Sequence, residues 1–558
     1  MPSVIWRPFV VILLLTLPLS GTISFAQSDK TGERRVSDTY VITNATIIPE
    51  PGKILTRQHL LFSEGVIKDI GDDIHIPAHA QKIKGDTLFL YPGFIDMANK
   101  IGVSKPNIPE KPADFDPSNP LPEIAGIHPH FSVLDHYSQN NDQDADWRKL
   151  GFTIAQKLPM GNGMLPGTTA VVLYGHKDKN NILDEKHSLY AKFSTVGGVY
   201  PNTTLGVMAK WRDLYHNAGL HSTHTSHYSS NRISIRPEQN KILEALSPIW
   251  EKQLPVLFEV SNELEMRRAI KLRDEAPFHL VLNGVNEGEQ LLPIIRKEKI
   301  DVVLTLNLPK DKHGSNEDQS PEETHADYEA RLKRSKEAYH KALSLAGEYE
   351  KAGIPFSFTT KHLAKNDFFD NLKLMIEKGL SKDGALAALT INPAGLLGLE
   401  SRAGTLEKGK MANLIALTDT LFHEDAEISF VVVDGYLFKY ETNNGKNGKK
   451  DESQYWTYTA ETDAGTSQGH WKLNKTADGY EGTVTYDDPD GGGEKSVPMQ
   501  NIKVDATRMR FEFHVDAGGN KLFIKIDGDI SGDELTGKLN IIDFGSFPIK
   551  AKKTEKPD

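Results

Sequence analysis

The 558-residue chain contains no cysteine. This absence excludes disulfide bonds, thiolate zinc sites and cysteine nucleophiles together, so any metal would need histidine, carboxylate or lysine-derived ligands. No basic block stands out in a chain with 76 acidic and 65 basic residues, so nucleic acid is not an expected partner.

Long apolar runs are missing everywhere except at the amino terminus. Arg7 precedes a nearly unbroken apolar run from Phe9 to Leu17, and Ser24-Phe25-Ala26 offers small residues where a signal peptidase cuts. The run is shorter than the roughly 20 residues that span a bilayer. We therefore expect residues 1–26 to be a cleaved signal peptide, and the protein to be exported, periplasmic or associated with the cell envelope, with no membrane span after cleavage.

Two separated stretches are predicted to form one β unit. Residues 40–95 contain short β-rich runs divided by turn pairs such as Pro51-Gly52 and Glu64-Gly65. Similar runs return in residues 403–440. Each stretch alone has too few strands to bury two faces, so we expect a composite β-sandwich built from both.

The stretch between them, residues 96–402, alternates β-rich runs such as Val302–Leu306 with helical segments such as Tyr328–Lys351. Alternation over this length is typical of parallel βα units and predicts a fold of the α/β class, a (β/α)8 TIM barrel.

A third unit follows. Residues 441–454 are polar and glycine-rich, which predicts a linker. Beyond it, in residues 455–558, apolar and polar side chains alternate, as at Phe511 and Phe513, without any helical pattern. We expect a C-terminal antiparallel β domain.

Three passages carry a family resemblance. They are Leu90-Tyr91-Pro92-Gly93-Phe94-Ile95-Asp96, the helix-like stretch from Gly379 to Leu399, and Gly404-Thr405-Leu406-Glu407-Lys408-Gly409-Lys410-Met411-Ala412-Asn413-Leu414-Ile415. Their order and spacing resemble the amidohydrolase superfamily, and its imidazolonepropionase-like branch in particular. The resemblance implies a TIM barrel that hydrolyses C–N bonds of cyclic or other non-linear-peptide amides with one or two zinc or similar divalent metals.

A looser resemblance points to the amino-terminal halves of duplicated amidohydrolase-like proteins exported by bacteria. It rests on the stretch from Gly206 to Tyr215, on Leu306-Asn307-Leu308-Pro309, and on a first barrel strand without histidines. This resemblance implies a non-catalytic half, here standing alone with a different C-terminal module.

The metal ligands that the superfamily resemblance implies are missing at the matching positions. Two histidines should follow Asp96 on alternate positions of the first barrel strand, but Ala98 and Lys100 stand there. A histidine should end the fifth strand, where the chain has Glu259. One carboxylate is not a metal site.

The later ligand positions are also changed. The sixth-strand histidine falls near Asn283, a poor zinc ligand, and the catalytic aspartate of the eighth strand falls at Lys361. A register slip brings in His362, but the next aspartate is Asp367. We therefore expect no metal cofactor and no confidently assigned catalytic residue.

The replacements are mostly charged, and they admit two interpretations. Lys100, Glu259 and Lys361 could converge so that an ammonium group takes the place of the metal and pairs with the glutamate. Alternatively, all three are solvated side chains at a barrel rim without mutual contact.

Histidines elsewhere provide a possible replacement site. His221, His224 and His227 recur at three-residue spacing near His216, and His128-Pro129-His130 lies in another segment. The serines and threonines between the first three predict a surface loop at residues 216–227 rather than a helix, and whether this loop binds metal stays open.

Three functions remain in competition. The first is a metal-free homologue that binds a small amide or peptide-like ligand, or a catalytic amidohydrolase partner chain. The second is an active exported amidohydrolase with an atypical ligand set. The third is a cell-envelope binding protein that acts through its C-terminal β domain, with Trp471, Tyr480 and Phe511 as surface aromatics. Fold resemblance cannot choose among them.

Overall fold

The computed structural model describes residues 39–554 with short gaps, of which residues 311–323 and 443–453 are the longest. Contacts divide the chain into two compact units, and the boundary between them in the sequence lies between Glu441 and Thr442. The expected signal peptide and most of the expected linker lie outside the described residues. Within the described part, no helix is long and apolar enough to cross a membrane.

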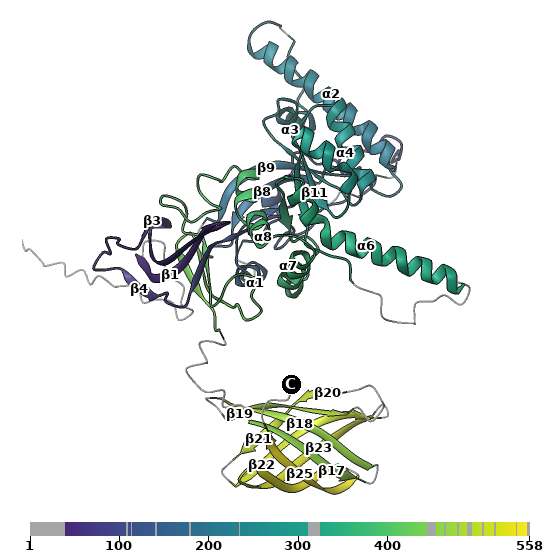
Figure 1. Ribbon diagram of the computed structural model, residues 1–558. Coiled ribbons are helices and arrows are strands. Elements are labelled where there is room, and N and C mark those ends of the chain that lie inside the picture. The colour runs from purple at the N-terminus through teal and green to yellow at the C-terminus, as the bar shows by residue number, and fades with distance from the viewer. Residues whose placement is uncertain are drawn as a thin grey trace, which may run out of the picture. The chain divides into compact units, whose positions relative to one another are not determined.

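The first sheet of the amino-terminal unit joins both flanks of the chain (Figure 1). Its strands run in the order β16-β15-β14-β5-β1-β2-β3, with β4 paired to β1. The strands are β1 (Tyr40–Glu50), β2 (Lys53–Ser63), β3 (Val66–Gly71), β4 (Gln81–Lys84), β5 (Phe89–Pro92), β14 (Leu414–Leu417), β15 (Ile428–Val433) and β16 (Tyr436–Lys439).

Side chains alternate between the two faces of these strands and so contribute to two different cores. Leu414 and Ala416 of β14 face a core formed within this sheet, whereas Ile415 and Leu417 belong to the larger core of the second sheet. Because successive side chains of a strand point to opposite faces, a single apolar strand fastens the two parts of the unit together.

The second sheet is barrel-like and follows chain order from β6 to β13. Its strands are β6 (Phe94–Asn99), β7 (Phe152–Lys157), β8 (Gly167–Leu173), β9 (Ile182–Lys192), β10 (Val256–Glu259), β11 (Leu280–Val285), β12 (Asp301–Thr305) and β13 (Ser357–Thr359). The edge strands meet where the Thr359 hydroxyl donates to the carbonyl oxygen of Ala98.

This sheet departs from the expected all-parallel barrel at one strand. β9 to β13 are mutually parallel and β6 is parallel to β7, but β8 is antiparallel to both of its neighbours. The connections on either side of β8, residues 158–166 and 174–181, are shorter than the dozen or more residues that a parallel crossover needs. The chain therefore turns back, and β8 replaces a βα unit.

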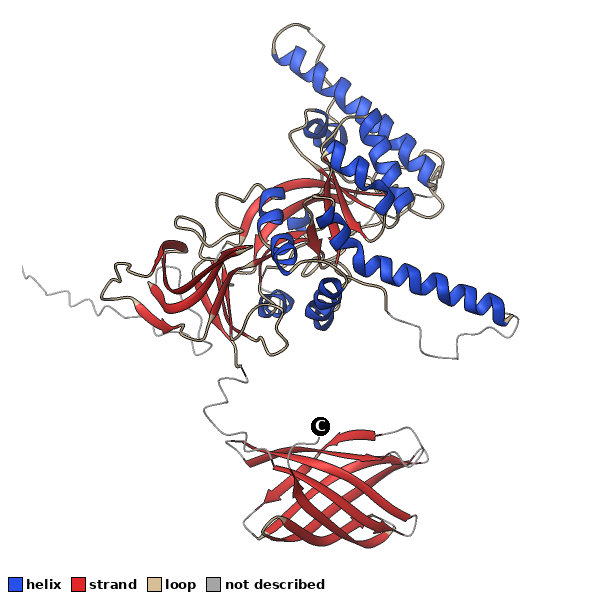
Figure 2. Cartoon of the chain, viewed as in Figure 1, coloured by secondary structure: helices blue, strands red, loops and turns tan. Residues whose placement is uncertain are grey.

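Helices connect or follow the remaining strands of this sheet (Figure 2). They are α1 (Asp142–Lys149), α2 (Thr204–Ser229), α3 (Lys241–Trp250), α4 (Glu263–Glu275), α5 (Leu292–Glu298), α6 (His325–Lys351), α7 (Phe368–Glu377), α8 (Lys382–Leu389) and α9 (Ile391–Leu396). Short 3-10 turns lie at Val133–Asp135, Glu289–Leu291 and Lys365–Asp367. In α6 the buried residues, from Leu343 to Tyr349, lie toward its carboxyl end.

The prediction of a histidine-rich loop is wrong, because His221, His224 and His227 lie inside α2. The intervening hydroxyl residues fit a helix, since the side chain of Thr223 donates to the carbonyl oxygen of Gly219 one turn earlier. The rings of His221 and His224 lie 3.1 Å and 3.0 Å from backbone carbonyl oxygens of the segment that follows α2. These two histidines therefore fasten that segment to the helix.

The carboxy-terminal unit is a nine-stranded antiparallel sheet in the order β20-β19-β18-β17-β25-β24-β23-β22-β21. Its strands are β17 (Gln454–Thr462), β18 (Gly465–Thr476), β19 (Gly479–Asp487), β20 (Glu494–Pro498), β21 (Gln500–Val504), β22 (Arg508–Ala517), β23 (Asn520–Ser531), β24 (Glu534–Ile541) and β25 (Gly545–Thr554).

The expectation of surface aromatics on this unit is wrong for two of the three residues. Trp471 and Phe511 are each only 1% exposed and pack against one another in the core, with ring centroids 5.1 Å apart. Tyr480 is half-buried and packs against the same core. The alternation of side chains along the strands places these aromatic residues on the inward face, where large rings fill the interior of the unit.

Candidate functional site at the barrel mouth

The candidate site lies at the carboxyl ends of the barrel-like sheet's parallel strands. Lys192, Glu259 and Asn283 are direct register partners on the adjacent parallel strands β9, β10 and β11. Residues in register on parallel strands point to the same face, so the three form one row. We use "barrel mouth" for this row together with Lys100 after β6 and Lys361 after β13.

An ion pair crosses the barrel mouth. The ammonium group of Lys361 donates to Oε1 of Glu259, and the two side chains are 8% and 22% exposed. The backbone NH of Lys361 is held by the hydroxyl of Thr359. The other oxygen of Glu259 is buried and has no hydrogen-bond partner among the described residues. An ammonium group therefore lies against the carboxylate where the resemblance implied a metal.

Two more lysines share this space. Lys192 donates to the carbonyl oxygen of Gly161 at 2.8 Å. Burial, reinforced by the charges of Lys100 and Lys361, lowers the pKa of Lys192 to about 8. The pKa of Lys100 is also lowered, by burial first and then by Lys361, against the opposing effect of Glu259. Three ammonium groups thus face one carboxylate.

Two of the positions where the resemblance implied metal ligands carry neutral side chains, Ala98 and Asn283. Ala98 is fully buried and has no polar side-chain atom, and its backbone carbonyl accepts from Thr359. Asn283 is also fully buried, and neither atom of its amide has a hydrogen-bond partner within the described residues. His362 has a pKa lowered by burial and by the nearby lysines, so it is disfavoured as a further cation.

Lys192 was not anticipated from the sequence. The family resemblance implies histidine and carboxylate ligands at the strand ends, and a lysine there is neither. A signal was nevertheless present, because the apolar run Leu189-Tyr190-Ala191 ends at this lysine. The same pattern of an apolar strand ending in a charge led to Glu259.

A shallow depression of about 460 Å³ opens beside the mouth. Lys100 and Lys361 line it, together with the apolar side chains of Ile101, Trp147 and Leu363. This volume falls in the range of small-molecule sites.

A second buried charge lies next to the mouth and was missed from the sequence. Lys157, the last residue of β7, is fully buried. Its ammonium nitrogen lies 3.0 Å from Asp144 and from the Ile101 carbonyl oxygen, and 3.2 Å from Asn99 and from the Tyr174 hydroxyl. Burial lowers the pKa of Lys157, and Asp144 opposes that effect.

Further hydrogen bonds extend this network to the first and last strands. The hydroxyl of Tyr137 donates to Asp144 at 2.7 Å, and the amide of Asn99 donates to Asp96 at 2.6 Å. Asp96, from the first family-like passage, also accepts from the backbone NH and the hydroxyl of Thr360. Asp96 therefore positions the segment that carries Lys361.

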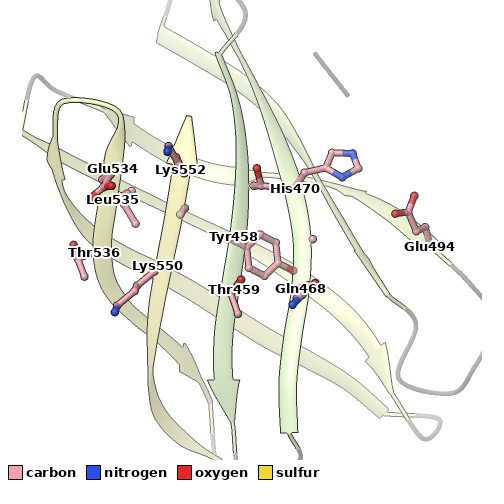
Figure 3. A pocket seen from close by; sticks show the side chains of 13 residues that line it. Tyr458, Thr459, Gln468, His470, Glu494, Glu534, Leu535, Thr536, Lys550 and Lys552 are labelled. Carbon is pink, nitrogen blue, oxygen red and sulfur yellow. The ribbon is translucent and has the colours of Figure 1, made fainter. Parts of the chain in front are cut away.

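The carboxy-terminal unit carries a separate polar groove of about 880 Å³ (Figure 3). Its outward side chains form two rows across β18, β17, β25 and β24, because their positions are direct register partners. One row is His470, Thr457, Lys552 and Glu534, and the other is Gln468, Thr459, Lys550 and Thr536. Both signs of charge line the groove.

Comparison with known proteins addresses the fold and the family. The sequence profile of the amidohydrolase family matches residues 322–438. An amidohydrolase from Thermotoga maritima MSB8 is similar in structure, with a TM-score of 0.59 and 20% identity over 72% of this chain and 100% of that one. The chain is therefore similar to the amidohydrolase family in sequence over residues 322–438 and to an amidohydrolase in fold over 72% of its length. No curated protein matches it in sequence.

A second similar structure is a putative prolidase from Bifidobacterium longum. Its TM-score is 0.44, with 15% identity over 74% of this chain and 98% of that one. The amidohydrolase from Thermotoga maritima is the stronger likeness, and at its level of identity it shows the shared fold alone.

Metal-dependent amidohydrolases imply a divalent cation at this mouth, but the residues present here do not fit one. Zinc takes imidazole, carboxylate or thiolate ligands. The mouth supplies one carboxylate, already paired with Lys361, and two further ammonium groups. Among the described residues, no group of three or more His, Asp or Glu side chains is placed to hold a metal.

The lowered pKa of Lys192 predicts a pH effect on stability. Between about pH 8 and 10.5 the unfolded chain binds a proton at this lysine and the folded chain does not, so the free energy of unfolding rises with pH in that window. We expect a rise of about 1–2 kcal/mol after allowance for partial solvation. In urea unfolding from pH 7 to 10.5, the free energy of unfolding should rise less for Lys192→Met than for the unchanged protein. An equal rise for both proteins would contradict the lowered pKa of Lys192.

Proposed function

We propose that this protein is a metal-free, non-catalytic member of the amidohydrolase superfamily that uses its barrel mouth for binding. The observation that carries the proposal is the ion pair between Lys361 and Glu259. It places an ammonium group against the carboxylate that would otherwise remain to hold a metal. The resemblance to the non-catalytic halves of duplicated exported amidohydrolases agrees with this interpretation.

Electrostatics support the proposal. Two unit charges 4 Å apart interact by about 4 kcal/mol at an effective dielectric of 20, and a dication doubles that repulsion for each ammonium group nearby. Lys100, Lys192 and Lys361 would all oppose a divalent cation, while Glu259 alone would attract it. Without a bound cation nothing lowers the pKa of a water molecule enough to make it a nucleophile at neutral pH.

Metal content is the direct test. The purified protein should contain no stoichiometric zinc, manganese or iron, and chelators should leave its melting temperature unchanged because no metal contributes to folding. It should not hydrolyse dipeptides, hydantoins or imidazolones in a metal-dependent manner. Elemental analysis, calorimetric melting with and without chelator, and hydrolysis assays with added metals provide these readouts.

A control separates surface zinc from zinc in the barrel. The variant His221→Gln, His224→Gln, His227→Gln removes the histidines of α2 and leaves the mouth intact. One metal per chain that survives this change but is lost in Glu259→Gln would refute the proposal and favour an active amidohydrolase with an atypical ligand set.

The cellular setting stays part of the proposal. We propose that the chain is exported and works in the periplasm or at the cell envelope, where it binds a small amide or peptide-like ligand or a catalytic amidohydrolase partner. A second candidate function is binding through the carboxy-terminal unit, which carries the polar groove. The aromatic side chains of Trp471 and Phe511, which we expected to bind a ligand there, are buried in the core of that unit.

A further inference from the structure

The barrel mouth has an excess of positive charge that the fold does not neutralise. Lys361 is paired with Glu259, and neither Lys100 nor Lys192 forms an ion pair among the described residues. The ammonium nitrogen of Lys100 lies 5.9 Å from the centroid of the Tyr190 ring. Partly buried like charges repel one another unless an anion joins them.

Polar groups at the mouth also lack partners. The amide of Asn283 and the second oxygen of Glu259 are buried without hydrogen bonds from the described residues. Buried polar groups are nearly always paired, with protein, water or ligand. Their position in one row with Lys192 points to a polar molecule at this place.

The depression beside the mouth adds an apolar wall. Ile101, Trp147 and Leu363 line it next to Lys100 and Lys361. At its edge Lys365 and Asp146 form an ion pair of 2.7 Å, so their charges cancel. The unpaired lysine that lines the depression is therefore Lys100, and the apolar side chains line the same depression.

We propose that the barrel mouth binds a small organic carboxylate, whose carboxylate group lies among Lys100, Lys192 and Lys361 and whose apolar body packs on Ile101, Trp147 and Leu363. This inference rests on the metal-free mouth of the proposed function. The anion takes the place that a metal with its bound hydroxide would fill. Charge-assisted hydrogen bonds from ammonium groups favour the carboxylate over any neutral isostere.

Titration calorimetry with matched ligand pairs tests the proposal. The probes are acetate, benzoate and the N-acetyl derivatives of alanine, leucine and phenylalanine, each compared with its neutral amide, with inorganic phosphate as a simple anion. We expect at least one apolar carboxylate to bind at least tenfold more tightly than its amide and more tightly than phosphate. Acetate, which has almost no apolar body, should be the weakest carboxylate.

Variants locate the site. Lys100→Met and Lys192→Met should each weaken the best carboxylate at least fivefold, and neither should unfold the protein because each removes a like charge. Lys365→Met is the matched control, since it alters a lysine of the same depression that is already paired, and its effect should stay within twofold.

The outcomes separate this inference from the proposed function. If every carboxylate binds no better than its amide, or if phosphate binds best, the inference fails while a metal-free barrel still stands. Equal effects of Lys100→Met and Lys365→Met would also overturn it. A stoichiometric metal in the same preparations would instead refute the proposed function, and the inference with it.

Discussion

Replacement of Asp144 by asparagine should lower the free energy of unfolding of the amino-terminal unit by about 3–5 kcal/mol. The substitution keeps the shape of the side chain and removes the negative charge that faces Lys157. The ammonium group of Lys157 is fully buried, and its 3.0 Å contact with Asp144 is its only ion pair among the described residues. An uncompensated buried charge is the main source of the expected loss.

The remaining partners of Lys157 do not compensate. Asn99, Ile101 and Tyr174 supply neutral oxygens, which accept hydrogen bonds but carry no charge. In the variant, Lys157 should lose its proton more readily, because the smaller effect of Asp96 is then the only carboxylate charge that opposes burial. The loss of stability should therefore shrink as the pH rises toward 10.

Asp146→Asn is the matched control on the same helix, α1. Its carboxylate pairs with Lys365 and Lys149 at the surface, so its loss should cost about 0–1 kcal/mol. Hydrogen-exchange protection of peptides from β6 and β7 during urea unfolding reports on the amino-terminal unit alone. Equal losses for the two variants would show that Lys157 is not held as a buried ion pair.

The sequence predicted the framework of the amino-terminal unit well and one of its strand directions badly. The run Val302–Leu306 was read as a strand and overlaps β12, and Leu90–Asp96 spans β5 and the start of β6. The run Gly167–Leu173 has the same apolar pattern whether its strand is parallel or antiparallel. Only the length of its connections distinguishes the two directions.

Strand register could be inferred from the sequence for only part of the site. Lys361 and Glu259 were placed by counting from family-like motifs, and the structure brings them into contact. The ion pair between Lys157 and Asp144 could not be predicted, because the residues next to Lys157 in the sequence do not show that its partner lies on another element. The histidines of α2 were misread, since weak helix propensity was outweighed by tertiary packing on residues such as Trp211 and Leu214.

Glu259→Gln should lower the free energy of unfolding of the same unit by about 2–4 kcal/mol. The change removes the one carboxylate that faces Lys100, Lys192 and Lys361 and keeps the volume of the side chain. Because Glu259 is partly exposed, water offsets some of the cost, and the expected loss is smaller than for Asp144→Asn. Urea unfolding with the same exchange readout measures it.

A double variant and a control decide what the loss means. If the ion pair is the cause, Glu259→Gln combined with Lys361→Met should recover most of the loss, since removal of both partners leaves no unpaired buried charge at that place. Glu263→Gln, which breaks an exposed pair with Arg267 at the start of α4, should cost about 0–1 kcal/mol. A loss below that range for Glu259→Gln, unchanged in the double variant, would mean that the lysines are solvated. The mouth would then have no need of a bound anion, because water would already screen the charges that attract one.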